Sequence, residues 1–192
     1  MKKILIIITI FFSTISTISA EEIKRIVVGN KEAKITIIAF ESLTCSHCAN
    51  FHKDVFPDLK KEYLDTGLAK IEFRHFPLDI AALNDSKDSQ CNNDGDSKIL
   101  NSLYANQQKW VKGSSVQAAN ENLQKFLVSE GYSVDFNKCI NDKEIEDFVL
   151  NDRIDGVKKY KVNATPTIII NNKKFEKTLN YKNLKKALEK LI

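Results

Sequence analysis

A change in the spacing of apolar residues at Cys45 restricts the fold of this chain more than any other feature. Before it, residues 34–40 form a β-branched, apolar run that is typical of a buried strand. After it, apolar residues recur every three or four positions, as on one helical face; they are Cys48, Phe51, Val55, Leu59 and Tyr63. Residues 69–76 then alternate like a second strand. A strand, a helix and a strand joined so closely predict two parallel strands.

Two residues should shape the helix between these strands. Thr44 precedes the helical pattern and is expected to be its N-cap. Pro57 lies inside the pattern, where its missing N–H and its ring should kink or interrupt the helix.

The rest of the chain reads as a helical block followed by a return to strands. Helical spacing is found near 79–87, 97–110, 115–130 and 142–160. An apolar strand then begins at Thr165-Pro166, and a turn at Asn171-Asn172 leads to a returning strand over 173–177 and a final helix over 181–191. The order predicts an α/β protein with a thioredoxin fold.

In this interpretation the chain is divided into four parts. Residues 1–20 are a leader, residues 21–77 and 162–192 are the two halves of the thioredoxin fold, and residues 78–161 are an inserted helical domain. The leader has a basic start at Lys2 and Lys3, an apolar run and small residues at Ser19-Ala20, which is the pattern of a secretory signal peptide. A retained membrane anchor is the alternative, although the run is short for a bilayer span of roughly 20 residues.

The charge balance argues against some classes of partner. The chain has 29 basic and 25 acidic residues, so loss of Lys2 and Lys3 with the leader would leave a net charge of +2. That balance gives no support for binding nucleic acid or anionic lipid. We expect no nucleic-acid partner and no cofactor.

Cys45 and Cys48 form a C-x-x-C pair that can carry thiol–disulfide exchange, which needs an attacking thiolate and a resolving thiol. At the start of a helix, free backbone N–H groups and the helix dipole lower the pKa of a thiol, here that of Cys45. A protonated His47 would favour the Cys45 thiolate further. Because these effects stabilise the reduced form, the disulfide is expected to be a strong oxidant.

Three other interpretations of this pair remain open: an inert structural disulfide, metal ligands together with His47 or His52, and buried apolar cysteines. His52 is expected to pack on the helix surface. His75 ends the second strand and is expected to be structural.

Cys91 and Cys139 flank much of the helical block and are expected to form a structural disulfide, since an even number of cysteines in an exported chain suggests pairing. Two free thiols or a second redox-active pair are the alternatives. Pro166 cannot donate a hydrogen bond to a sheet, so it either begins its strand in the trans form or follows a cis bond.

These residues resemble the DsbA-like bacterial disulfide oxidoreductases over nearly all of the chain after the leader. The clearest stretch is Ser-Leu-Thr-Cys-x-His-Cys within 41–52; residues 29–35, 56–59, 74–78 and 164–167 keep the family's order. The resemblance implies that Cys45 is the nucleophile, Cys48 the resolving cysteine and Pro166 a cis-proline preceded by Thr165. A cis bond would let the backbone of Thr165 pair with an incoming polypeptide and bring Pro166 close to the sulfurs.

The sequence departs from the family at informative positions. Ser46 stands where proline is frequent, and this position tunes redox potential. Ala39 occupies the place of a buried acid, six residues before the first cysteine; Glu41 lies two residues on and shares the face of Ala39 if the strand continues regularly. Proton transfer could then use Glu41, water or His47. Thr165 occurs in both isomerases and oxidases, so it does not separate them.

The leading hypothesis is a monomeric periplasmic dithiol oxidase that passes its disulfide to reduced, unfolded exported proteins. The resemblance implies a membrane-bound, quinone-linked partner that reoxidises it. The alternatives are an isomerase or reductase of the same fold, a non-catalytic substrate-binding protein or chaperone, and an exported metal-binding protein.

Overall fold

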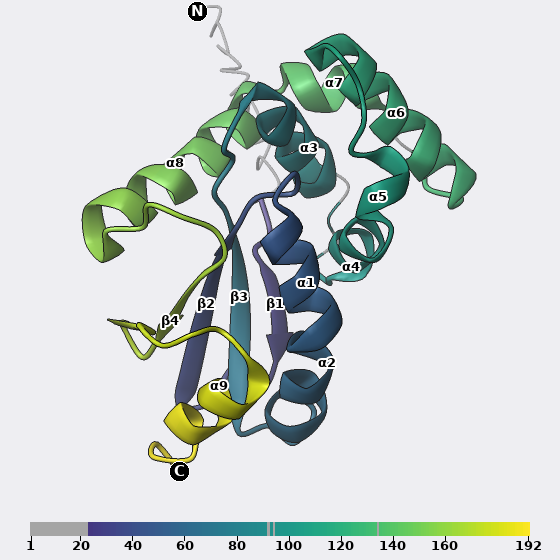
Figure 1. Ribbon diagram of the computed structural model, residues 1–192. Coiled ribbons are helices and arrows are strands. Elements are labelled where there is room, and N and C mark those ends of the chain that lie inside the picture. Colours follow the sequence, from purple (N-terminus) through teal and green to yellow (C-terminus); the bar gives the residue numbers. More distant parts are fainter. Residues whose placement is uncertain (1–22, 92, 94, 134) are drawn as a thin grey trace, which may run out of the picture.

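The computed structural model describes residues 23–91, 93, 95–133 and 135–192. The leader expected over residues 1–20 lies outside these described residues. The described part is a mixed α/β structure in which helices pack on both faces of one sheet (Figure 1).

The sheet has five strands in the order β1-β3-β2-β4-β5. Its members are β1 (Ile26–Gly29), β2 (Ile35–Glu41), β3 (Ala69–His75), β4 (Thr167–Ile170) and β5 (Lys173–Lys174). The central strands β2 and β3 are parallel, while β1 and β4 run antiparallel to their neighbours, as β5 does to β4. The parallel pair confirms the strand–helix–strand unit, and the whole confirms the predicted fold class.

Alternation along β2 divides the core between the two faces of the sheet. Ile37 and Ala39 belong to the larger core, which also contains buried residues of the helices that follow β2. Ile38 and Phe40 point the other way and pack with Phe76 in a smaller cluster. Because both faces are covered, the strand is apolar on both sides, as a buried central strand must be.

Helices α1 (Ser46–Asp54) and α2 (Phe56–Leu59) follow β2, and a π-helical turn (Lys60–Leu64) completes the crossover. The break between α1 and α2 confirms the interruption expected from Pro57, which lies in the first turn of α2. Proline is tolerated there because a first-turn N–H has no helical partner.

The described part of the segment between β3 and β4 is built from helices and the connections between them. It contains α3 (Ile80–Cys91), α4 (Lys98–Ala105), α5 (Gln107–Trp110), α6 (Val116–Ser129), α7 (Phe136–Asn141) and α8 (Lys143–Tyr160). Leu103, Trp110 and Leu127 from this segment join the same core as Ile37 and Cys48. The helical segment is therefore packed directly against the first half of the thioredoxin fold.

Helix α3 is unusual because most of its buried residues are polar. It contacts α6, α7 and α8, and six consecutive polar residues from Asp85 to Gln90 are buried there. Lys87 pairs with Glu146 at 2.7 Å and Gln90 bonds to His75 at 3.1 Å. Cys91, at the end of α3, forms a disulfide with Cys139 of α7.

The chain ends in a hairpin and a helix. Asn171 and Asn172 both have positive φ, 44° and 66°, which places the turn where it was expected. Strand β5 is shorter than the expected 173–177, and α9 (Tyr181–Leu188) stops before residue 191.

Candidate active site at the carboxyl end of β2

The sheet register brings two distant segments together. Phe40, near the end of β2, pairs with Thr167, the first residue of the antiparallel β4. The residues that follow β2 therefore meet those that precede β4. Cys45 and the cis Thr165–Pro166 peptide lie in these two segments, and the Cys45 thiol donates to the Thr165 carbonyl oxygen at 3.4 Å.

Cys45 itself occupies the N-cap position of α1, so the expectation that Thr44 is the N-cap is wrong. The Cys45 side chain makes no capping hydrogen bond, which leaves its sulfur available beside the first N–H groups of the helix. Thr44 instead turns its hydroxyl toward Asp79, donating to Oδ2 at 3.4 Å.

The pKa of Cys45 is lowered from 9.0 to about 5. The largest cause is a hydrogen bond from the Cys48 thiol; partial burial opposes it, and Thr165 and the backbone N–H groups of Cys48 and His47 lower the pKa further. The imidazole expected to help lies on an exposed residue, so His47 acts on the Cys45 pKa through its backbone.

Cys48 is the opposite case. It is 0% exposed, and burial raises the pKa of its thiol, helped by the hydrogen bond to Cys45 and by the negative charge of Glu41. The two sulfurs therefore differ strongly: one is a half-buried, readily ionised thiol, and the other is a buried thiol that holds its proton.

Glu41 continues the alternation of β2 and lies on the face of Ala39, beneath the cysteines. It is 4% exposed, and its Oε2 is 2.8 Å from Nε2 of His52. The His52 side chain is only 5% exposed, so the expectation that it packs on the helix surface is wrong. The physical reason is helical spacing: His52 follows the buried Cys48 by four residues and shares its face.

Aromatic rings enclose this buried pair. The His52 ring stacks on Tyr104 at 4.1 Å and on Phe73 at 5.2 Å between centroids. Tyr104 comes from α4, and burial together with the Glu41 carboxylate raises the pKa of its hydroxyl. Tyr104 of the helical segment thus covers one face of the His52 ring.

Gln107 of α5 ties the helical segment to the cysteine loop. Its amide group is buried and donates to the carbonyl oxygens of Leu43 at 2.7 Å and Cys45 at 3.0 Å. Nothing in the spacing around Gln107 signals this contact, because it depends on how α5 docks.

The remaining histidine, His75, is buried at the end of β3. Its ring bonds to Gln90, its backbone N–H donates to Asp152 at 3.2 Å, and burial lowers the pKa of its imidazole. These contacts join β3 to α3 and α8, which fits the structural role expected from the sequence.

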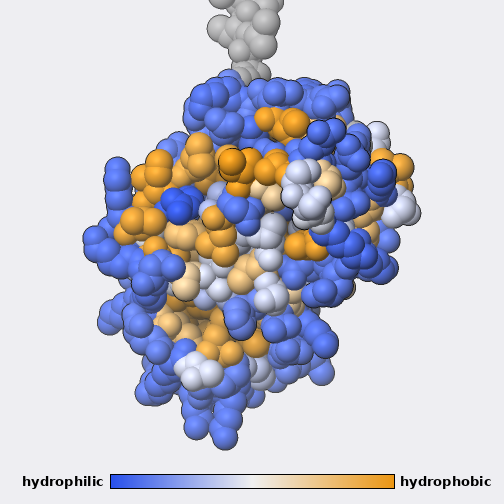
Figure 2. All heavy atoms as spheres, turned by 45° about the horizontal axis from the view of Figure 1, so that its top comes forward, coloured by the Kyte–Doolittle hydropathy of each residue, from blue (hydrophilic) through white to orange (hydrophobic). Residues whose placement is uncertain are grey.

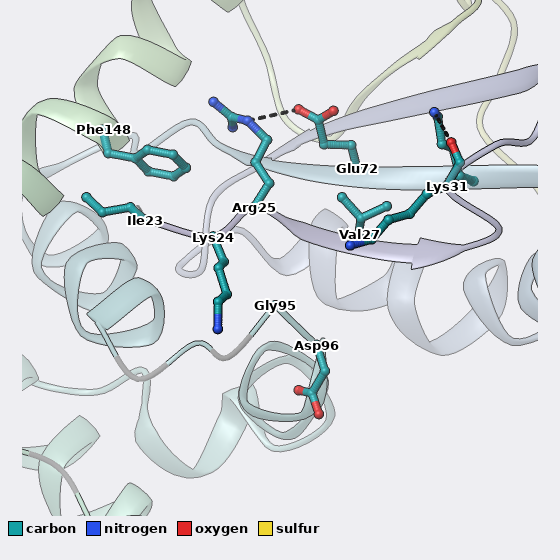
Figure 3. A pocket seen from close by; sticks show the side chains of 10 residues that line it. Ile23, Lys24, Arg25, Val27, Lys31, Glu72, Gly95, Asp96 and Phe148 are labelled. Carbon is teal, nitrogen blue, oxygen red and sulfur yellow. Dashed lines mark hydrogen bonds and ion pairs between the residues drawn. The ribbon is translucent and has the colours of Figure 1, made fainter. Parts of the chain in front are cut away.

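Hollows on the surface differ in their relation to the cysteines. One of about 540 Å³ is lined by His47, Thr165 and Pro166, together with Tyr181 of α9. Another, of about 990 Å³, lies along β1 (Figure 3). There Arg25 pairs with Glu72 at 3.2 Å and lies over the ring of Phe148, so these side chains already have structural partners.

Within the described ranges, no cluster of three or more histidine, cysteine or acidic side chains is arranged to hold a metal ion. Nor does any described helix combine the length and apolarity that a membrane crossing needs.

Comparisons with known proteins agree with this geometry. A family model described as Thioredoxin matches residues 21–190. The crystal structure of alpha-DsbA1 from Wolbachia pipientis is 31% identical, with a TM-score of 0.74 over 87% of this chain and 90% of that chain. Disulfide bond formation protein D from Bacillus subtilis is 26% identical over 85% of this chain and 75% of its own length.

A protein named as a protein-disulfide oxidoreductase in Rickettsia bellii is 27% identical over 86% of this chain. The chain spans a little under two thirds of that relative, 64% of its length. The family model covers nearly all the described residues, and the Wolbachia structure aligns over most of both chains. The chain therefore belongs to the thioredoxin family, among its DsbA-like members.

Proposed function

We propose that this protein is an exported thiol–disulfide oxidoreductase that gives its Cys45–Cys48 disulfide to reduced, unfolded exported proteins. The observation that carries the proposal is the contrast within the pair: the pKa of the half-buried Cys45 is about 5, whereas burial raises that of Cys48. An exchanger needs this asymmetry, since the outer sulfur must be the better leaving group and nucleophile.

The reaction transfers two electrons from substrate to enzyme. A substrate thiolate attacks Cys45 of the oxidised pair, the Cys45–Cys48 bond breaks, and Cys48 leaves and takes up a proton. A second substrate thiolate then attacks the substrate sulfur of the mixed disulfide, and Cys45 leaves as a thiolate. The substrate gains one disulfide, and the enzyme is left reduced.

Cys45 is the nucleophile in this scheme and Cys48 the resolving residue. Thr165 and Pro166 would position the substrate, because the Thr165 carbonyl oxygen lies 3.4 Å from the Cys45 sulfur and can accept a backbone hydrogen bond from an extended segment. His47, exposed beside them, would contact the substrate and supply its backbone N–H to the Cys45 sulfur.

The direction of exchange follows from which form is stabilised. A thiolate held by hydrogen bonds stabilises the reduced form, and a stabilised reduced form makes the disulfide a stronger oxidant. We therefore favour a dithiol oxidase over an isomerase or reductase. Residues 1–20 would direct the chain to the periplasm, where it would act as a monomer and a membrane-bound, quinone-linked partner would restore the disulfide.

Glu41 and His52 would serve the proton chemistry of Cys48. During reoxidation Cys48 must lose a proton before it attacks the mixed disulfide at Cys45, and burial makes that loss difficult. Glu41 is the carboxylate whose charge acts on the Cys48 pKa, and His52 holds it in place. The pair would replace the acid that is missing at Ala39.

The test is oxidation of a reduced dicysteine peptide by the oxidised protein. We expect turnover by the wild type, loss of it in Cys45→Ser, and a trapped mixed disulfide at Cys45 when the Cys48→Ala variant meets a substrate disulfide. A variant lacking Cys91 and Cys139 should keep the activity. A Cys45–Cys48 disulfide that does not react with the peptide would instead indicate a structural bridge in a non-catalytic binding protein.

A further inference from the structure

A second groove, of about 650 Å³, begins beside the cysteine loop and is distinct from the hollow at Pro166. Thr44, the residue immediately before Cys45, forms part of its wall. The other walls come from the start of α3 and from the segment that joins α5 to α6, and they present the apolar side chains of Ile80, Trp110, Val111 and Val116.

Several of these apolar side chains are open to solvent. Ile80 is 64% exposed, and Val111 and Val116 are exposed at 36% and 39%. Figure 2, which brings the top of Figure 1 forward, shows several hydrophobic patches on this face, with atoms of intermediate hydropathy between them and hydrophilic atoms around the edge. Exposed apolar surface that is rimmed by polar groups is typical of a binding site.

Two carboxyl groups give the groove an acidic side. Asp79 is exposed; its Oδ1 accepts the N–H of Ala82 at 2.7 Å and its Oδ2 faces the Thr44 hydroxyl. Asp85 lies further along α3 and is only 2% exposed, yet it lines the groove.

One oxygen of the Asp85 carboxyl group is not satisfied by the described part of the protein. Its Oδ1 accepts no hydrogen bond from any described residue. Burial, followed by the nearby charges of Asp79 and Asp88, raises the pKa of this carboxyl well above its usual range, which favours the protonated form in the free protein. A cationic group that enters the groove would favour the ionised form. An unsatisfied buried polar group costs free energy, and it calls for a donor that is absent from the free protein.

The chemistry of the groove selects among occupants. An acidic side chain would be repelled, and a purely apolar one would leave Asp85 without a donor. A lysine or arginine side chain satisfies both parts, because its aliphatic stem packs on apolar walls while its charged head donates to carboxylates. Lys112 also lines the groove and is exposed, so it offsets part of the negative charge at the rim.

We propose that this groove is a specificity subsite that binds a lysine or arginine side chain of the substrate polypeptide, next to the cysteine that reacts with Cys45. The inference rests on the proposed function and adds to it a preference for substrates with a basic residue beside the reacting cysteine. Thr44 connects the two sites, since it contacts Asp79 on one side and is bonded to Cys45 on the other.

Three dicysteine peptides test the subsite. They are identical except that both residues flanking the first cysteine are lysine, glutamine or glutamate, and each is oxidised by the oxidised protein at low ionic strength. We expect the second-order rate constant to be highest for the lysine peptide, intermediate for the glutamine peptide and lowest for the glutamate peptide. The charge pairs should make the rate for the lysine peptide about tenfold that for the glutamate peptide. Asp79→Asn and Asp85→Asn should each reduce the ratio of the lysine-peptide rate to the glutamate-peptide rate by at least about half.

Asp58→Asn is the matched control for Asp79→Asn, because Asp58 is also an exposed aspartate but lies on α2, outside the groove. Equal rates for the three peptides would overturn the subsite. The same holds if the ratio of the lysine-peptide rate to the glutamate-peptide rate persists in both groove variants, or if it falls equally in the control. If Asp85→Asn does not fold, Asp79→Asn alone decides, since Asp79 is exposed. Failure of the wild type to oxidise even the glutamine peptide would overturn the proposed function, and the subsite with it.

Discussion

At the scale of single residues, the site depends on two sulfurs placed differently in one helical turn. Cys45 occupies the N-cap position of α1 and is half-buried, whereas Cys48 faces the core. The sequence predicted this contrast, because the strand-to-helix change fixes where Cys45 lies and the i+3 spacing turns Cys48 inward. It did not predict that the His47 backbone, rather than the imidazole, would act on the Cys45 thiol.

The lowered pKa of Cys45 predicts how its reactivity depends on pH. Alkylation of the reduced protein by iodoacetamide should rise with a midpoint near pH 5, instead of near the ordinary value of 9.0. The lowered pKa also makes the stability of the reduced form depend on pH. The Cys45 thiolate contributes fully to the free energy of unfolding above the pKa of the unfolded thiol, and this contribution is lost as the pH falls through about 5. A Cys48→Ala variant, which lacks the strongest hydrogen bond to the thiolate, should have a higher midpoint.

Glu41 should affect reoxidation more than folding. In Glu41→Gln, we expect the reduced protein to be reoxidised by glutathione disulfide at least about tenfold more slowly, because Cys48 loses its proton acceptor. The rate should also fall more steeply as pH is lowered than in the wild type. Glu32→Gln, at an exposed position, is the control. An unchanged rate and an unchanged pH profile would remove Glu41 from the mechanism.

At the scale of elements, the predictable parts are those with a clear hydrophobic period. The strands β2 and β3 and the helix between them follow from alternation and helical spacing. Helix α3 was placed near its observed start. The burial of its polar residues from Asp85 to Gln90 could not be predicted, because it results from the packing of α6, α7 and α8 against α3. Strand β1 was missed: its four residues are too few to define a period and are held by pairing with β3.

The contact between α5 and the cysteine loop gives a prediction at this scale. Gln107→Ala should lower the free energy of unfolding by about 1–3 kcal/mol, because it leaves the carbonyl groups of Leu43 and Cys45 without their donor. Urea denaturation of the oxidised protein measures the change. Gln108→Ala, at the exposed neighbouring position, should change it by less than about 0.5 kcal/mol. Equal effects of the two substitutions would contradict a specific role for Gln107.

At the scale of the whole molecule, the thioredoxin fold supplies the site and the helical segment completes it. The order of strands and helices along the sequence was sufficient to predict the α/β class and the interruption of the fold. Docking of the helical segment was not predictable from it. Tyr104 against His52 and Gln107 against the cysteine loop depend on contacts between residues more than fifty positions apart.

The Cys91–Cys139 disulfide should stabilise the molecule without taking part in exchange. It closes a loop with a sequence separation of 48 between α3 and α7, and replacing both cysteines with alanine should cost about 2–4 kcal/mol of unfolding free energy. Peptide oxidation by the folded variant should stay near the wild-type rate. A loss of exchange activity at a temperature where the variant is folded would instead favour a second redox-active pair.

The equilibrium redox potential of Cys45–Cys48 against glutathione tests the central claim most directly, with Cys91–Cys139 left intact. Because the reduced form is stabilised through the Cys45 thiolate, we expect a potential clearly above the thioredoxin value of about −270 mV, with the oxidised form less stable than the reduced form. A potential near or below about −270 mV would contradict the oxidase proposal and indicate a reductase or a structural bridge.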